Sequence, residues 1–343
     1  MRILVTGATG FLGAHLVPLL LKDGHQVVGI GRSKPGPALQ GAEFIQADLQ
    51  DKEAVRRALE GVEAVYHLAG LVSFDPKDGR KMYALHVDAT RSLLSEVRER
   101  CPQLKRFILA STSGAIAVSA DEKIHTEEDL YPIEVTGRWP YYASKIHEER
   151  MTLEYCRKHS IPLVVMNPSL LLGPGDDRLS STWTVAKFLA GDIPSMPNGG
   201  MSFVDVRDAA AGFHAALTKG ELGGRHLMGV NMSLREFYER LSRMTGVRTP
   251  PLRLPKQLNV LGAHLLEKWA DMRGTKPSLV PQEVEIGEHF FYFDSAKAER
   301  ELGFRARDPH ETLHDTVSYI VSRMPANSRP GRLGELWDRR KGT

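Results

Sequence analysis

The chain opens with a short apolar strand that runs directly into three glycines and then into a helix, MRILVTGATGFLG. The run Ile3–Val5 is continuously aliphatic, which is typical of a strand buried on both faces of a parallel sheet. Gly7, Gly10 and Gly13 remove side chains where a backbone must turn sharply, approach a phosphate and pack a helix on a strand. The new helix offers unpaired N–H groups to that anion. The spacing is G-x-x-G-x-x-G, and alone it leaves open a glycine-rich turn that binds nothing.

Composition narrows the class of protein. At 343 residues the chain can bury a substantial hydrophobic core, either as one large domain or as two domains that share a cleft. The net charge of +3 gives no reason to expect nucleic acid or a membrane surface as a partner, and no apolar run has the length of a membrane span. Two cysteines, Cys101 and Cys156, favour a reducing compartment, so we expect a cytoplasmic protein. The scattered histidines indicate no metal site.

Strand and helix patterns alternate through the first half of the chain. This alternation predicts an α/β fold with a doubly wound parallel sheet. The expected strands after the first are 26–30, 44–46, 64–67, 107–109 and 163–166, and the expected helices are 11–22, 52–59, 80–100 and 141–158.

Frequent prolines after residue 168 predict a smaller C-terminal α+β lobe that covers the sheet edge and takes the substrate. We expect residues 1–167 and 202–228 to form the nucleotide-binding domain, residues 168–201 and 229–325 the substrate lobe, and residues 326–343 a solvated tail.

Tyr141 and Lys145 lie four residues apart in WPYYASKIHEER, a segment with helical character. Side chains at this spacing share a helix face, so the phenol and the ammonium can point into one site. A phenol needs nearby positive charge to act as an acid or base at neutral pH, and Lys145 can supply it. Tyr142 is a competing candidate, and a surface Tyr/Lys pair is the alternative interpretation.

The order of these motifs resembles the extended short-chain dehydrogenase/reductase family. The family joins a T-G-x-x-G-x-x-G loop to a Y-x-x-x-K helix, and here TGATGFLG stands at 6–13. Further similar pieces are ADL at 47–49, YHLAG at 66–70, FILASTSG at 107–114, NPSLLLGPGD at 167–176, FVDVRD at 203–208 and FDSAKAERELGF at 293–304. The overall pattern is most similar to the dihydroflavonol-reductase and 3β-hydroxysteroid-dehydrogenase-like branch.

The resemblance implies a Rossmann-type fold, a dinucleotide cofactor and a role for each matching residue. Tyr141 would exchange a proton with the substrate oxygen, Lys145 would bind the nicotinamide ribose and lower the pKa of the tyrosine, and Thr112 would orient the same oxygen. His86 stands where the family often has asparagine, either as a proton relay or water-holding residue or as a neutral packing residue. The expected cofactor-binding residues are Gly7, Thr9, Gly10, Phe11, Leu12, Gly13, Arg32, Asp48, Leu49, Leu68, Ala69, Gly70, Tyr141, Lys145, Pro168 and Leu170.

The end of the second strand bears on the choice of cofactor. Members of the family that prefer NAD tend to carry an acid there, whereas this chain has Gly31 followed by Arg32, Ser33 and Lys34. A guanidinium fork with no opposing carboxylate suits an adenosine 2′-phosphate. We therefore expect NADP, with NAD as the alternative and a solvent-facing basic loop as the interpretation without a ligand.

The substrate is less constrained. Relatives that act on nucleotide sugars hold the diphosphate with an arginine, and this position falls on Met201, which argues against an epimerase or dehydratase. The resemblance implies a small hydrophobic ketone or alcohol as substrate and a homodimer packed through helices at 88–100 and 141–158. A non-catalytic dinucleotide sensor is the third alternative. Apolar residues that could line a pocket or form lobe core are Trp183, Val185, Phe188, Leu189, Ile193 and Met196.

Overall fold

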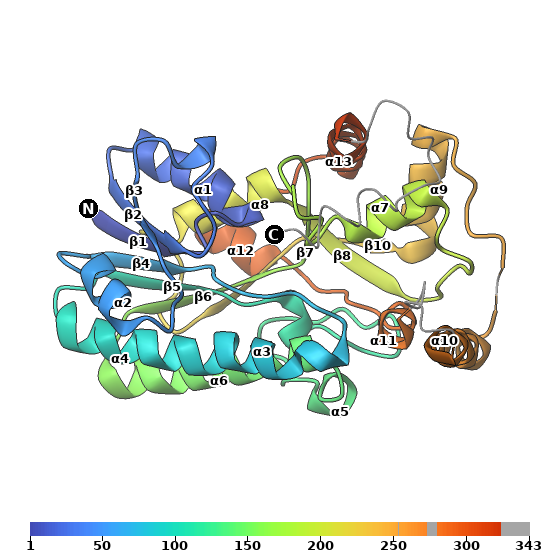
Figure 1. Ribbon diagram of the computed structural model, residues 1–343, viewed down its shortest axis with the longest axis horizontal. Helices are drawn as coiled ribbons and strands as arrows, with labels where there is room; N and C mark the ends of the chain where they lie inside the picture. Colours follow the sequence, from blue (N-terminus) through green and yellow to red (C-terminus); the bar gives the residue numbers. More distant parts are fainter. Residues whose placement is uncertain (253, 273–279, 324–343) are drawn as a thin grey trace.

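A seven-stranded parallel sheet is the framework of the protein (Figure 1). The computed structural model describes residues 1–252, 254–272 and 280–323. The strand order is β3-β2-β1-β4-β5-β6-β9, so the chain winds outward in both directions from β1 and β4. The fold class predicted from the sequence is confirmed. The strands are β1 (Arg2–Thr6), β2 (Gln26–Gly31), β3 (Glu43–Gln46), β4 (Ala64–His67), β5 (Arg106–Ala110), β6 (Leu163–Pro168) and β9 (Arg225–Met228).

Helices cover both faces of this sheet, as the aliphatic run of β1 requires. Ile3 and Val5 pack into the core on one face, and Leu4 packs into the core on the other. The first face is covered by α1 (Phe11–Lys22) and α8 (Val206–Ala215), and the second by α2 (Lys52–Ala58), α4 (Thr90–Arg100) and α6 (Pro140–His159). α12 (Ala296–Leu302) packs against α8 and β9.

The helix expected over residues 80–100 is composite. It begins as α3 (Gly79–Tyr83), continues as a π-helical segment (Ala84–Ala89) and ends as α4. Single π turns inside helices occur frequently at functional sites. The remaining short elements are the 3₁₀ turns η1 (Pro37–Leu39), η2 (Pro76–Asp78) and η4 (Ser113–Ala115), and the short helix α5 (Ile133–Thr136).

A smaller lobe lies beyond the carboxyl ends of the parallel strands (Figure 1). Its three-stranded sheet has the order β10-β8-β7, with β7 (Leu170–Leu172), β8 (Gly200–Asp205) and β10 (Val230–Ser233). Its helices are α7 (Trp183–Ala190), α9 (Leu234–Thr245), α10 (Lys256–Met272), α11 (Pro281–Ile286) and α13 (Pro309–Ser322). The domain boundaries given above stay a prediction, and the tail at 326–343 lies outside the described residues.

The apolar residues of α7 and of the segment after it form the core of this lobe. Val185, Phe188, Leu189 and Met196 are buried in one cluster, and Trp183 and Ile193 pack against it. Of the two interpretations given above, lobe core is therefore the one that the structure supports.

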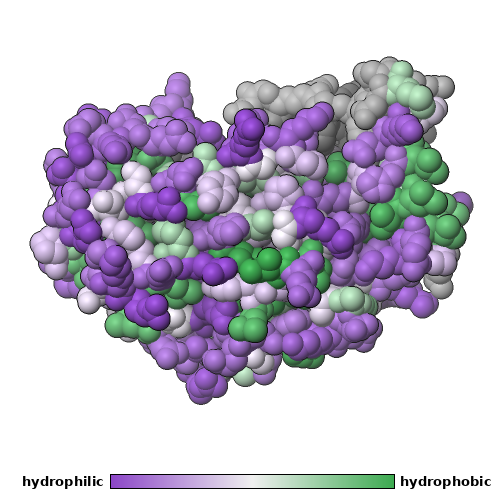
Figure 2. Space-filling view, turned by 90° about the horizontal axis from the view of Figure 1, so that it is seen from below, coloured by the Kyte–Doolittle hydropathy of each residue, from purple (hydrophilic) through white to green (hydrophobic). Residues whose placement is uncertain are grey.

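Helix α10 leaves an apolar face exposed at the end of the lobe. Leu258, Leu261, Leu265 and Met272 are each at least half exposed. Hydrophobic residues gather at the same end of the molecule, on the right of Figure 2. Among the described residues, however, no helix combines the length and the apolar character needed to cross a membrane.

Candidate active site

Most of the residues expected to bind the cofactor, and Thr112, which is expected to be catalytic, follow strands of the parallel sheet at its carboxyl edge. Thr9 and the glycines follow β1, Arg32 follows β2, Asp48 and Leu49 follow β3, Leu68–Gly70 follow β4, Thr112 follows β5, and Pro168 and Leu170 lie where β6 passes into β7. In open α/β sheets, ligands bind in the crevice outside this edge, where the strand order reverses. The reversal here lies between β1 and β4.

The glycine loop lies directly at that reversal. Gly7 has φ +68°, and a Cβ there would lie 2.8 Å from the backbone N of Ala69 and 2.8 Å from the carbonyl carbon of Leu68. The turns after β1 and β4 therefore touch through a glycine that no other residue can replace without strain.

The first turn of α1 fits an anion. Gly10 is the N-cap and makes no side-chain capping hydrogen bond, and the first turn contains no acidic residue. Backbone N–H groups of the first turn have no partner within a helix, and the helix dipole is positive at this end. A dinucleotide pyrophosphate suits this cradle on the same grounds as in other nucleotide-binding folds.

Thr112, Tyr141 and Lys145 come together at the ends of β5 and α6. The Thr112 hydroxyl hydrogen-bonds the Tyr141 phenol and accepts a bond from Gly114 N at 3.3 Å. Lys145 is 4% exposed, and its ammonium donates to the carbonyl oxygen of Ala110 at 2.7 Å. A phenol, a hydroxyl and an ammonium thus line one edge of the crevice.

Burial raises the pKa of Tyr141 to about 12, while the bond from Thr112 opposes that rise and the Glu148 carboxylate adds to it. The phenol therefore holds its proton at neutral pH. The expected lowering of the Tyr141 pKa by Lys145 is not seen in this arrangement, in which Lys145 is paired with a carboxylate.

The neighbouring hydroxyl groups point elsewhere. The Tyr142 ring packs over Gly114, where a Cβ would come within 2.1 Å of its Cε1, and it contacts Trp139 and Phe291. Ser111 donates to the Glu149 carboxylate. Tyr141, rather than its neighbour, is thus the tyrosine that meets Thr112.

A buried chain of hydrogen bonds runs from Lys145 to the end of β1. Lys145 pairs with Glu148, which accepts from Thr90 Oγ1 at 3.1 Å. His67 joins Thr90 at 2.7 Å and Thr6 at 2.8 Å. Burial, with Lys145 nearby, lowers the pKa of His67 to about 3, and burial raises that of Glu148 to about 7.

His86 occupies the π-helical segment and is fully buried. Its Nε2 accepts from Leu71 N at 3.0 Å, so Nδ1 carries the proton and donates to Ser144 Oγ at 2.8 Å. Ser144 in turn donates to the carbonyl oxygen of Tyr141 at 2.7 Å. Burial lowers the pKa of His86, and both ring nitrogens are used within the protein, which matches a neutral packing histidine rather than a relay.

The two glutamates after Lys145 were not expected from the sequence. Glu148 and Glu149 are at most 1% exposed. Glu149 accepts from Asn167 at 2.8 Å and from Tyr131 at 3.1 Å. Positions 145, 148, 149 and 152 form one helical stripe, so the spacing from Lys145 could have revealed them.

The adenosine end of the crevice is open and basic. Arg32 is 73% exposed in its side chain, and its Nε lies 4.0 Å from the Asp48 carboxylate. A Cβ on Gly31 would lie 3.5 Å from Thr9 Oγ1, an ordinary contact. Because residue 31 is glycine, this position offers no carboxylate to repel a phosphate, and Asp48 pairs only weakly with Arg32.

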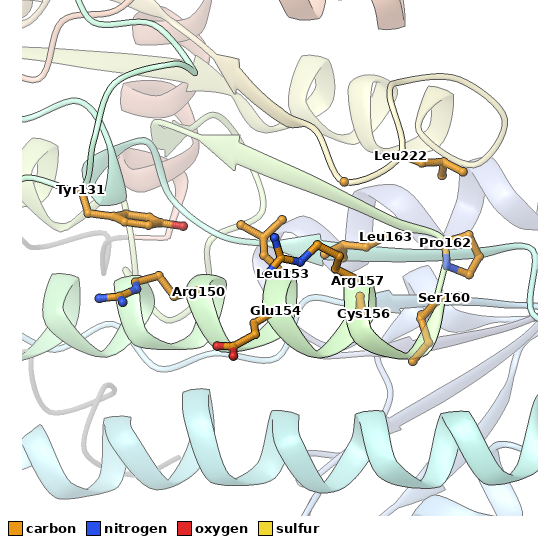
Figure 3. A pocket seen from close by; sticks show the side chains of 12 residues that line it. Tyr131, Arg150, Leu153, Glu154, Cys156, Arg157, Ser160, Pro162, Leu163 and Leu222 are labelled. Atoms are coloured by element: carbon orange, nitrogen blue, oxygen red, sulfur yellow. The ribbon is translucent and has the colours of Figure 1, made fainter.

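A groove of about 670 Å³ lies along the outer side of α6 (Figure 3). Arg150, Leu153 and Arg157 of α6 face Tyr131 and Leu222 across it. None of the residues expected to be catalytic lines it. The groove is therefore distinct from the crevice at the sheet edge.

Residues 3–229 match the family described as NAD dependent epimerase/dehydratase. The chain belongs to this family. The chain is 31% identical to a putative dihydroflavonol 4-reductase of Synechocystis, over 92% of this chain and 93% of that protein. It is 30% identical to sterol demethylase protein B of Methylococcus capsulatus, over 94% of this chain and 99% of the relative.

Solved structures of similar proteins agree on the fold. The crystal structure of gox2253 aligns with a TM-score of 0.80 at 26% identity, covering 94% of this chain and 99% of that one. UDP-glucose 4-epimerase of Thermotoga maritima aligns with a TM-score of 0.71 at 21% identity, with the same coverage. The family is NAD(P)-dependent, and its relatives here include reductases.

Proposed function

We propose that the protein is an NADP(H)-dependent oxidoreductase that interconverts a ketone and a secondary alcohol on a small, hydrophobic substrate. The observation that carries the proposal is the meeting of Thr112 and Tyr141, with Lys145 bonded to the end of β5, at the sheet edge that also carries the glycine loop. A protein that only binds a dinucleotide has no need of a half-buried phenol beside a hydroxyl at the crevice.

Each of the three residues has one task. The cofactor, when bound, supplies or accepts a hydride. Tyr141 donates a proton to the carbonyl oxygen during reduction, and Thr112 orients the same oxygen by a hydrogen bond. Lys145 would hold the nicotinamide ribose hydroxyls when the cofactor binds. Because the Tyr141 pKa is about 12, the phenol is protonated at neutral pH and is ready to act in the reducing direction.

The glycine loop and the turn after β2 would hold the rest of the cofactor. The first turn of α1 would take the pyrophosphate, and Asp48 and Leu49 would lie beside the adenine. Arg32 would bind the 2′-phosphate, since guanidinium groups bind phosphate oxygens in a bidentate manner.

Similar proteins suggest the class of substrate. The relatives are named for a dihydroflavonol, a sterol and a hydroxysteroid, all largely hydrophobic. Met201, which packs against the lobe core, offers no charge to a sugar diphosphate. We further propose a cytoplasmic homodimer that packs through α4 and α6, the helices on the lower side of Figure 1.

The test is NADPH oxidation against a panel of flavanonols, steroids, β-keto acyl compounds and nucleotide sugars. A Tyr141→Phe variant should lose about 10²- to 10⁴-fold in turnover, the usual contribution of a general acid. Tyr142→Phe is the matched control, because its ring packs against Gly114 and the same helix carries both residues. Full turnover by Tyr141→Phe would refute the mechanism.

The same panel separates the alternatives. An epimerase or dehydratase would convert a nucleotide sugar with no net change in NADPH. A sensor would bind the cofactor and turn over none of the compounds.

A further inference from the structure

The segment between β7 and α7, residues 173–182, reaches from the lobe to the cofactor half of the molecule. Gly173 and Gly175 have φ of +122° and +104°. A Cβ on Gly175 would lie 2.9 Å from Cε1 of His15 and 3.7 Å from Cε2 of Phe11. The segment thus lies against the first turn of α1, next to the glycine loop.

Buried groups fix the shape of this segment. The Asp176 carboxylate is 3% exposed and accepts from the backbone N of Ser180, Ser181 and Thr182 at 3.0, 2.8 and 3.0 Å. Leu179 is 7% exposed and packs into the lobe core. Arg178 therefore projects from a loop whose two ends are held.

Arg178 extends to the turn after β2. Its Nη2 donates to Ser33 Oγ at 2.7 Å, across 145 positions of sequence. In the part of the chain that the structure describes, its guanidinium has no carboxylate within 4.0 Å. A guanidinium that donates to a neutral hydroxyl keeps most of its capacity to bind an anion.

The local charge favours a phosphate at this point. Arg32 and Lys34 flank Ser33 in sequence, and both are exposed. Among the described residues, Asp48 is the one carboxylate paired with Arg32, at 4.0 Å from its Nε. Arg178, from the loop after β7, thus reaches the turn after β2 that carries Arg32.

We propose that Arg178 is a second arginine of the adenosine 2′-phosphate subsite, so that a bound 2′-phosphate joins the substrate lobe to the turn after β2. The inference rests on the proposed NADP(H) dependence and deepens it. Arg32 and Arg178 would bind the phosphate from two sides, and Ser33 would bind it through its hydroxyl. NADPH would then bridge residues 173–182 and 31–34, whereas NADH, without the phosphate, would not.

The test compares the affinities of NADPH and NADH by fluorescence titration. Arg178→Ala should weaken NADPH binding by about ten-fold or more, the usual effect of losing a charged hydrogen bond, and should leave NADH within about two-fold. Arg178→Lys should lie between. The matched control is Arg235→Ala, which removes another exposed guanidinium from the lobe, on α9, paired with Glu239 at 2.9 Å.

The outcomes are distinct. Equal weakening of NADPH and NADH by Arg178→Ala would show that the arginine only shapes the loop, and unchanged affinities would show that it does not reach the ligand; either result overturns the inference. If the unmodified protein prefers NADPH and the variant keeps that preference, the inference fails while the proposed function stands. If the unmodified protein binds NADH more tightly, the NADP preference fails, and the inference fails with it.

Discussion

Replacing Gly13 by alanine should separate the folding role of the glycine loop from its binding role. Gly13 lies in the third position of α1, where a Cβ would come 2.5 Å from the carbonyl oxygen of Gly7 and 2.7 Å from that of Ala8. Both neighbours are backbone atoms, so α1 must move away from the loop. Such overpacking typically costs about 1–3 kcal/mol, against which the helix preference of alanine returns roughly 1 kcal/mol. Because both clashes are with backbone atoms, the cost lies in the upper half of that range, about 2–3 kcal/mol, and the net loss of about 1–2 kcal/mol should lower Tm by roughly 1–3 °C in a chain of 343 residues.

Two other glycines give the comparison its meaning. A Cβ on Gly10 would meet a single atom, the Gly7 carbonyl oxygen at 3.1 Å, and its φ of −81° is open to alanine. Gly10→Ala should therefore keep Tm within about 1 °C of the unmodified protein, yet weaken binding of the cofactor by crowding the pyrophosphate. Gly262 lies inside α10 with no atom within 4 Å of its Cβ, so Gly262→Ala should stabilise by about 0.5–1 kcal/mol.

Urea and thermal unfolding, followed by circular dichroism, measure the three stabilities, and a fluorescence titration with NADPH measures binding. If Gly13→Ala unfolds at the Tm of the unmodified protein, the close packing of α1 on the loop does not constrain the fold as argued. If Gly10→Ala binds NADPH normally, the pyrophosphate does not bind at the glycine loop.

Three further predictions follow from other contacts. Gly31→Asp should fold normally, because its Cβ would meet Thr9 Oγ1 at 3.5 Å, an ordinary contact. It should shift the ratio of NADPH to NADH affinity toward NADH by about ten-fold, because the new carboxylate repels the 2′-phosphate. An unchanged ratio would contradict the 2′-phosphate site. The Glu148 pKa is raised to about 7 from 4.5, so the folded chain binds that proton more tightly and stability should fall as pH rises through this window. Glu148→Gln should flatten this part of the curve in urea unfolding at about pH 5 and about pH 8. Arg207→Ala should cost about 1–3 kcal/mol in urea unfolding, since the Asp205 carboxylate, 2% exposed, loses two bonds of 2.8 Å; an unchanged midpoint would refute this.

Most of the main sheet could be predicted because its strands are short aliphatic runs between glycine and polar turns. The segment Ala64–His67 was expected with its observed bounds, and the helix at 141–158 was expected one residue short at each end. Strands of the smaller sheet were harder to predict. β7 and β10 are three and four residues long and pair with β8, whose distance along the chain no local pattern encodes.

Contacts of the candidate site that follow from sequence spacing could be predicted, whereas contacts that depend on tertiary packing could not. Tyr141 and Lys145 share a helix face by their separation alone. The pairing of Lys145 with Glu148 depends on how deeply α6 is buried, which the sequence does not state. The contact between Arg178 and Ser33 joins residues 145 positions apart, so only the folded chain brings them together.

Two hydrogen bonds join the composite helix to α6, the helix that carries Tyr141. His86 bonds Ser144, and Thr90 bonds Glu148, so both rungs join residues 58 positions apart and lie four residues apart on each helix. His86 lies in the π-helical segment and Thr90 is the first residue of α4, so the two rungs stand on either side of the junction between them. Deleting one residue there would rotate one rung away from the other, and α6 would lose its axial alignment. A change in this helix, whose His86 ring lies 6.1 Å from the Tyr141 ring between centroids, would thereby displace Tyr141 along the edge of the sheet.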